Sequence, residues 1–90
     1  MKYVLFYESA NDVLSKAPPH IAAHSAHLAR FRDRGVLLMG GAYENPQDGA
    51  LMIFTGREAA EEFAAGDPYV RNGVVRNWRI RAWNETQAGP

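Results

Sequence analysis

The chain has 90 residues, in which ten basic side chains balance ten acidic ones and cysteine is absent. This length suits one small domain with a single hydrophobic core. The balanced charge gives no indication of a nucleic-acid or membrane partner, and the lack of cysteine excludes disulfides and thiolate catalysis. Because there is neither a leader segment nor an apolar run of about 20 residues, we expect a cytoplasmic protein without a membrane span.

The first segment, residues 2–8 (KYVLFYE), is rich in aromatic and β-branched residues and is predicted to form a strand. One face of this strand carries Tyr3, Leu5 and Tyr7, and the other carries Val4 and Phe6. Both faces are apolar, and one layer of helices covers only one of them, so a second protein surface is expected on the other. We therefore expect a homodimer formed by packing two sheets. Residues 9–16 are predicted to be a polar connection.

All three histidines lie in residues 18–35 (PPHIAAHSAHLARFRDRG), which are predicted to form one helix. The two prolines suit its first turn, and Gly35 suits the left-handed residue that follows a helix. At about 100° per residue, one apolar stripe contains Ile21, His24, Leu28 and Phe31. His24 lies in the middle of this stripe and His20 and His27 at its margin, so we expect only His24 to be largely buried.

A histidine on an apolar stripe needs a hydrogen-bond partner. His24 could be a core residue satisfied by a backbone carbonyl, a general base at the floor of a cleft, or a metal ligand. The spacing of His20, His24 and His27 would allow two imidazoles to meet one ion. However, no acidic residue precedes the second histidine, as in the helical zinc-protease motif. We therefore expect no bound metal and no other cofactor.

Two further strands are predicted at residues 36–43 and 50–54. The turn formers between them, ENPQDG, indicate an antiparallel hairpin with a loose loop. Gly40 and Gly41 interrupt the first of these strands. Paired glycines indicate a β-bulge or a close approach of the backbone to another group, and a bulge is the preferred interpretation.

The segment from Thr55 to Glu58 has the spacing of a capping box and predicts a helix over residues 57–65. Its small apolar face consists of Ala59, Ala60, Phe63 and Ala64. Gly66 ends this helix, and an aspartate before a proline, Asp67-Pro68, predicts a short helical turn capped by the carboxylate.

Residues 74–83 are predicted to form the last strand, with alternating faces. One face carries Trp78, Ile80 and Ala82, and the other carries Asn77, Arg79 and Arg81. The order strand, helix, strand, strand, helix, strand predicts an α+β, ferredoxin-like βαββαβ fold with a four-stranded antiparallel sheet. We expect a single domain over residues 1–83, followed by a polar tail at 84–90.

Three features together resemble the YciI-like (YCII-related) proteins over residues 1–83. They are His24 in a helix that ends at Gly35, the hairpin with Gly40-Gly41, and the segment 65–70 (AGDPYV) followed by Gly73. The resemblance implies a dimeric α+β barrel and an enzyme with a His–Asp pair in a cleft, which here is His24 and Asp67. Ile21 and Gly41-Ala42 depart from the family's pattern, which has an arginine and a Gly-Pro at these places.

The main functional hypothesis is a small cofactor-independent enzyme in which Asp67 orients His24 for general acid–base chemistry. The reaction would be an elimination or isomerisation of a small conjugated organic substrate, and the resemblance implies a dehydrochlorinase-like example. The candidate substrate-binding residues are Tyr7, Gly41, Tyr69 and Arg79, with Arg81 as an alternative to Arg79. A non-catalytic dimeric ligand-binding or sensor module and a cofactor-free oxygenase remain open.

Overall fold

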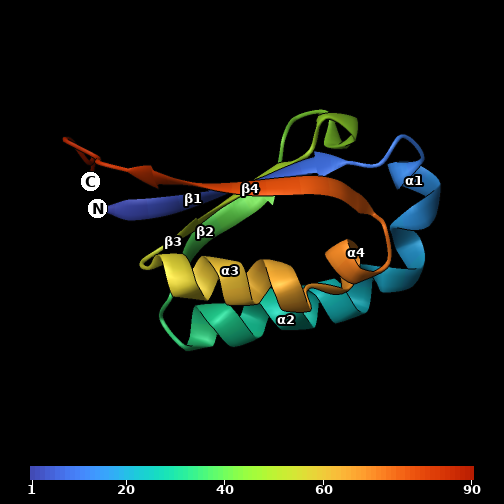
Figure 1. The fold of residues 1–90 in the computed structure, drawn as a ribbon, viewed down its shortest axis with the longest axis horizontal. Helices are drawn as coiled ribbons and strands as arrows, with labels where there is room; N and C mark the ends of the chain where they lie inside the picture. The colour runs from blue at the N-terminus through green and yellow to red at the C-terminus, as the bar shows by residue number, and fades with distance from the viewer.

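A computed structural model describes residues 1–90. Its strands are β1 (Lys2–Ser9), β2 (Leu37–Ala42), β3 (Ala50–Phe54) and β4 (Val75–Trp83), and its helices are α1 (Val13–Lys16), α2 (Ile21–Asp33), α3 (Arg57–Gly66) and α4 (Pro68–Arg71). The strands form one antiparallel sheet in the order β2-β3-β1-β4. The long helices α2 and α3 both lie against the same face of this sheet (Figure 1). The predicted α+β ferredoxin-like fold is therefore confirmed.

The strand register divides the sheet into a helix face and an open face. Leu5 and Tyr7 of β1 point toward the helices and belong to the buried core. Val4 and Phe6 point the other way, where they pair across the sheet with Ile53 and Leu51. Val4, Phe6, Leu51, Ile53, Arg81, Ala82 and Trp83 line an apolar hollow on this open face. No α-helix lies against the open face (Figure 1).

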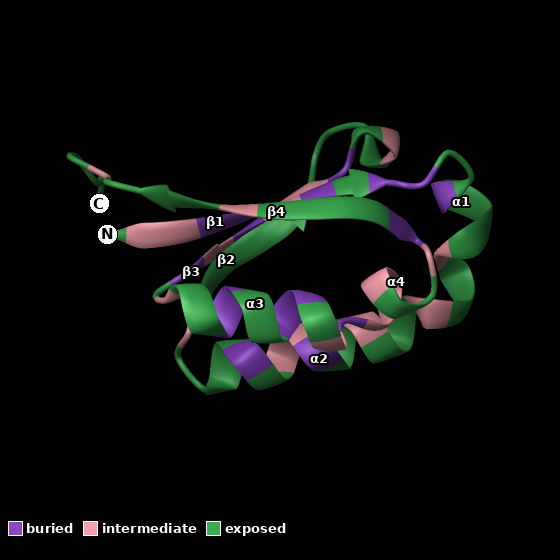
Figure 2. Cartoon of the chain, viewed as in Figure 1, coloured by how far each residue is buried: buried purple, intermediate pink, exposed green.

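The core lies between the sheet and the two long helices. The four residues predicted as the apolar face of α3, Ala59, Ala60, Phe63 and Ala64, are all buried, as Figure 2 shows. Phe63 contacts the rings of Phe31 and Phe54 with centroids 5.2 and 5.3 Å apart, distances typical of favourable aromatic pairs. Three small alanines let α3 approach the sheet closely, so this one phenylalanine reaches the centre of the core.

Two helix predictions differ from the structure. The predicted helix over 18–35 consists of a 3-10 turn at Pro18–His20 followed by α2, and residues predicted as a polar connection include α1, anchored by buried Val13. The predicted capping box is wrong: Gly56 caps α3, and no side chain makes a capping hydrogen bond. In a capping box Glu58 would accept from the backbone N–H of Thr55, but this N–H donates to Val36 instead, and α3 begins one residue later than the box requires.

The preference for a bulge at Gly40 and Gly41 is also wrong. The register of the β2–β3 pair shifts between Leu37 and Met39, before the two glycines. Gly40 lies opposite Met52, and a Cβ at Gly40 would stand 2.7 Å from Met52 Cγ. A close approach of the strand to a buried side chain therefore explains Gly40, whereas a Cβ at Gly41 would meet nothing within 4 Å.

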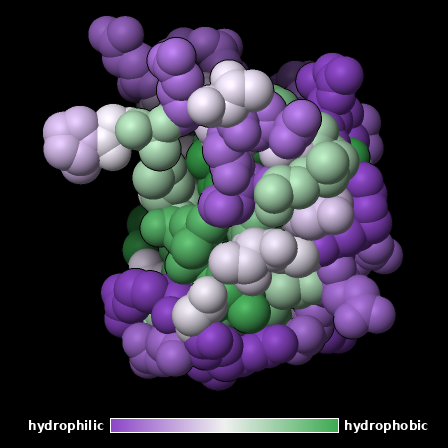
Figure 3. Space-filling model, turned by 90° about the vertical axis from the view of Figure 1, so that its left-hand side faces the viewer, coloured by the Kyte–Doolittle hydropathy of each residue, from purple (hydrophilic) through white to green (hydrophobic).

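Apolar side chains are also exposed beside the edge strand β2. Leu38 and Met39 are exposed, and both line a groove between β2 and α2. Figure 3, which looks at the end of the molecule that holds both termini, shows hydrophobic side chains gathered into one patch with hydrophilic ones around it.

None of the helices has the length and apolar character required to cross a bilayer.

Candidate active site

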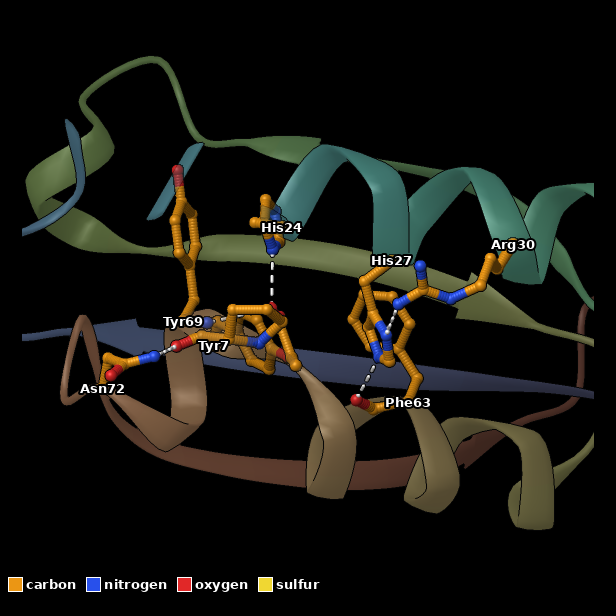
Figure 4. Close-up of polar contacts among 9 residues, drawn as sticks. Tyr7, His24, His27, Arg30, Phe63, Tyr69 and Asn72 are labelled. Carbon is orange, nitrogen blue, oxygen red and sulfur yellow. Dashed lines mark hydrogen bonds and ion pairs between the residues drawn. The ribbon is translucent and has the colours of Figure 1, made fainter. Parts of the chain in front are cut away.

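The site is built around the carboxylate of Asp67, which is fully buried between α3 and α4. Its Oδ1 accepts a hydrogen bond of 3.0 Å from the backbone N–H of Tyr69 and so caps α4, as predicted. The same oxygen accepts a bond of 2.7 Å from His24 Nδ1, and Oδ2 accepts one of 2.6 Å from the Tyr7 hydroxyl. Donors from α2, α4 and β1 thus satisfy one buried carboxylate (Figure 4), as a buried polar group requires.

His24 lies in the first turn of α2, and its side chain is 15% exposed. Its ring stacks on that of Tyr69, with centroids 3.8 Å apart and planes 5° from parallel, and Phe63 meets it edge-on. An ionised carboxylate only accepts hydrogen bonds, so Nδ1 carries the proton that points to Asp67. Nε2 has no partner in the chain, and Glu85 Oε2 is the only buried side-chain polar atom without one. Solvent therefore reaches the Nε2 lone pair.

Both tyrosines of the site are neutral phenols over the ordinary pH range. Burial raises the pKa of Tyr7 far above its usual value, and the charge of Asp67 and the hydrogen bond to it raise that pKa further. Burial and the Asp67 charge also raise the pKa of Tyr69. Tyr7 therefore acts toward Asp67 as a hydrogen-bond donor.

The expectation that only His24 is largely buried is wrong, because His27 is 6% exposed. Arg30 donates to His27 Nδ1 at 3.2 Å, so the proton of the ring lies on Nε2, which donates to the carbonyl oxygen of Phe63 at 2.9 Å. The ring packs against Phe31 and Phe63, and Figure 4 shows its hydrogen bonds with Arg30 and Phe63. With both nitrogens satisfied, a neutral imidazole fits the core, and the covered face of α2 is centred on His27 and Phe31.

The three histidines do not form a common ligand set. Both ring nitrogens of His27 are already bonded within the chain, and His20 is the residue that precedes α2. No group of three or more His, Cys, Asp or Glu side chains is placed to hold a metal ion.

The structure brings Tyr7 and Tyr69 to the His24–Asp67 pair, but it does not bring Gly41 or Arg79 there. Arg79 pairs with Phe6 across the sheet, and its guanidinium lies 4.9 Å above the Phe6 ring on the open face. Gly41 pairs with Leu51 on the same open face. Because neighbours in a strand alternate between faces, these two residues and the dyad are on opposite sides of the sheet.

The five main surface hollows do not include the dyad, because neither His24 nor Asp67 lines any of them. The Nε2 edge of His24 lies outside these hollows, and a cleft at the dyad stays a prediction. The hydrogen bond of the Tyr7 hydroxyl to Asp67 was not predicted from the sequence. A signal was present, because Tyr7 shares the core face of its strand with Leu5 and a buried tyrosine hydroxyl needs a hydrogen-bond partner.

Comparisons with known proteins agree with this architecture. Residues 1–84 match the YCII-related domain. Protein YciI of Escherichia coli O6:H1 and protein YciI of Shigella flexneri are each 30% identical to the chain, over 94% of its length and 98% of theirs. The solved structure of 5-chloro-2-hydroxyhydroquinone dehydrochlorinase (TftG) from Burkholderia phenoliruptrix, in complex with 2,5-dihydroxybenzoquinone, has the same fold. The TM-score between this structure and the protein is 0.77, the two sequences are 18% identical, and the match covers 96% of each chain. The chain therefore belongs to the YCII-related family.

Proposed function

We propose that the protein is a small cofactor-independent enzyme in which His24 is the general base and Asp67 orients it. The observation that carries this proposal is the 2.7 Å hydrogen bond between His24 Nδ1 and Asp67 Oδ1, which leaves Nε2 unpaired at the surface. A carboxylate that fixes the tautomer of a histidine in this way is a recurring arrangement in acid–base catalysis.

The proposed reaction is a proton abstraction from a small conjugated organic compound. Nε2 takes the proton, the electron pair of the broken bond forms a new double bond, and a leaving group such as chloride departs with its own bonding pair. The imidazolium then returns its proton to solvent. General acid–base assistance supplies about 10²–10⁴-fold, which suits an acidic phenol or enol. The fold shared with a dehydrochlorinase that was crystallised with a quinone supports this substrate class.

We also propose that the protein is a homodimer that packs the open faces of two sheets together. The support is the apolar hollow on the open face, which Val4, Phe6, Leu51, Ile53 and Trp83 line. Burial of such a surface is the usual reason for a small domain to associate. In this assembly Arg79 and Gly41 would belong to the interface and not to the site of their own chain.

Turnover and binding with two probes test the enzymatic proposal. The probes are 5-chloro-2-hydroxyhydroquinone, assayed for chloride release, and 2,5-dihydroxybenzoquinone, titrated by absorbance. We expect His24→Gln to lose about 10²-fold or more in rate and Asp67→Asn to lose rate while keeping the cap of α4, because asparagine caps almost as well as aspartate. His20→Gln, on the turn before α2 and outside the dyad, is the matched control.

Each outcome separates the candidate functions. Equal rates for wild type and His24→Gln would refute the base role. Tight binding of the quinone without chloride release would favour the non-catalytic ligand-binding module. If only Asp67→Ala is destabilised, and both Asp67→Asn and Asp67→Ala bind the quinone as wild type does, Asp67 is only a helix cap.

A further inference from the structure

The two oxygens of the Asp67 carboxylate have different partners. Oδ1 receives both His24 Nδ1 and the Tyr69 backbone N–H, whereas Oδ2 receives only the Tyr7 hydroxyl. Tyr7 is 4% exposed and comes from β1, 60 residues away along the chain. A hydroxyl that the sheet holds rigidly therefore fixes the far side of the carboxylate.

A carboxylate can turn about its Cβ–Cγ bond, since this terminal torsion is broad and weakly restricted. The bonds at Oδ1 fix one oxygen, and a donor at Oδ2 is what sets the plane of the group. We propose that Tyr7 is a positioning residue, whose hydroxyl holds Asp67 in the orientation in which Oδ1 accepts the Nδ1 proton of His24. This assignment replaces the expected role of Tyr7 in binding substrate, and its catalytic consequence rests on the proposed function.

The consequence of removing the hydroxyl follows from the burial of Asp67. Without Tyr7 Oη, Oδ2 becomes a buried acceptor with no partner, which is costly. The carboxylate then turns or takes up a proton, and in either case it holds the Nδ1–H tautomer of His24 less firmly. Free imidazole side chains in water favour the other tautomer, so the Nε2–H form should gain population.

The test is the tautomer ratio of neutral His24, measured from imidazole nitrogen NMR shifts of the full chain. Tyr7→Phe keeps the ring and removes only the hydroxyl, and we expect the ratio of Nδ1–H to Nε2–H to fall roughly two- to tenfold, the range of one hydrogen bond. Tyr3→Phe is the matched control, since Tyr3 lies on the same strand and the same face but contacts Arg57 instead. An unchanged ratio in Tyr7→Phe would overturn the proposal, even if its melting temperature falls.

A second variant decides the matter if Tyr7→Phe does not fold. 3-Fluorotyrosine in place of Tyr7 keeps the ring and the hydroxyl and strengthens the donor, which draws charge from the carboxylate and should lower the ratio of Nδ1–H to Nε2–H in His24. The control carries 3-fluorotyrosine in place of Tyr3, and an equal tautomer ratio in the two proteins would count against the proposal. These spectra need no substrate, so a failure to detect turnover would not contradict the positioning role of Tyr7. In turn, an unchanged tautomer ratio of His24 would refute that role without contradicting the proposed enzymatic function.

Discussion

At the scale of single residues, His24 and His27 lie one turn apart on α2 and have different environments. His27 donates through Nε2 and accepts through Nδ1, so both of its ring nitrogens have partners within the chain. His24 uses only Nδ1, and its second nitrogen remains available. The partners of the two nitrogens therefore distinguish the candidate base from the core histidine, although His27 is the more buried of the two.

His27 is predicted to be needed for stability. His27→Ala removes a packed ring and leaves the Phe63 carbonyl without its buried donor, so we expect a loss of about 2–4 kcal/mol in the free energy of unfolding. Denaturant unfolding measures this loss. His20→Ala, at a half-buried histidine without a capping hydrogen bond, should change stability by less than about 0.5 kcal/mol. Similar losses in both variants would contradict the assigned role of His27.

The raised pKa of Tyr7 predicts how stability depends on pH. The folded chain keeps the Tyr7 proton at pH values where the unfolded chain has lost it. The contribution of Tyr7 to the free energy of unfolding is therefore fully present below the ordinary tyrosine pKa of about 10, and it falls as the pH rises above that value. Tyr7→Phe should be less stable than wild type near neutrality and should lose less of its stability above pH ~10. Parallel curves of unfolding free energy for the two proteins would contradict this prediction.

At the scale of elements, local patterns in the sequence predicted the fold. The features that these patterns missed depend on contacts between residues far apart in the sequence. The alternation of β1 and the apolar face of α3 are periodic, so both could be identified from the sequence. The cap by Asp67 depends on adjacent residues and was equally accessible. In contrast, the Tyr7–Asp67 bond joins residues 60 positions apart, and no periodicity encodes such a pairing. The alternation of the last strand assigned Arg79 to one face, but it did not identify the face of the sheet on which the dyad lies.

The two glycines of β2 form a matched pair for testing the packing of this strand. Gly40→Ala places a methyl group against Met52, which is 2% exposed and has little room to move. Overpacking of this kind costs about 1–3 kcal/mol. Gly41→Ala places its methyl group in open space on the other face and should be neutral or slightly stabilising in an isolated chain. Thermal unfolding of both variants measures the difference, and equal melting temperatures would refute the close approach at Gly40.

At the scale of the whole molecule, the single sheet has two different faces. The helix face carries the core and, at the start of α2, the dyad with its two tyrosines. The open face carries apolar residues that no element of the chain covers (Figure 1). As a monomer, a domain of this size buries only a modest fraction of its surface. Burial of the open face in an assembly would therefore add stability.

The proposed homodimer makes the last prediction. We expect a dimer in sedimentation experiments at micromolar concentrations and a melting temperature that rises with protein concentration. Phe6→Asp should give a monomer, because the new carboxylate can stay hydrated beside Arg79 in a free chain but would lose its hydration in a buried interface. Leu14→Asp is the control, since Leu14 is 72% exposed on α1, away from the sheet. A wild-type monomer with a concentration-independent melting temperature would refute the dimer, and a dimeric Phe6→Asp variant would place the interface elsewhere than on the open face.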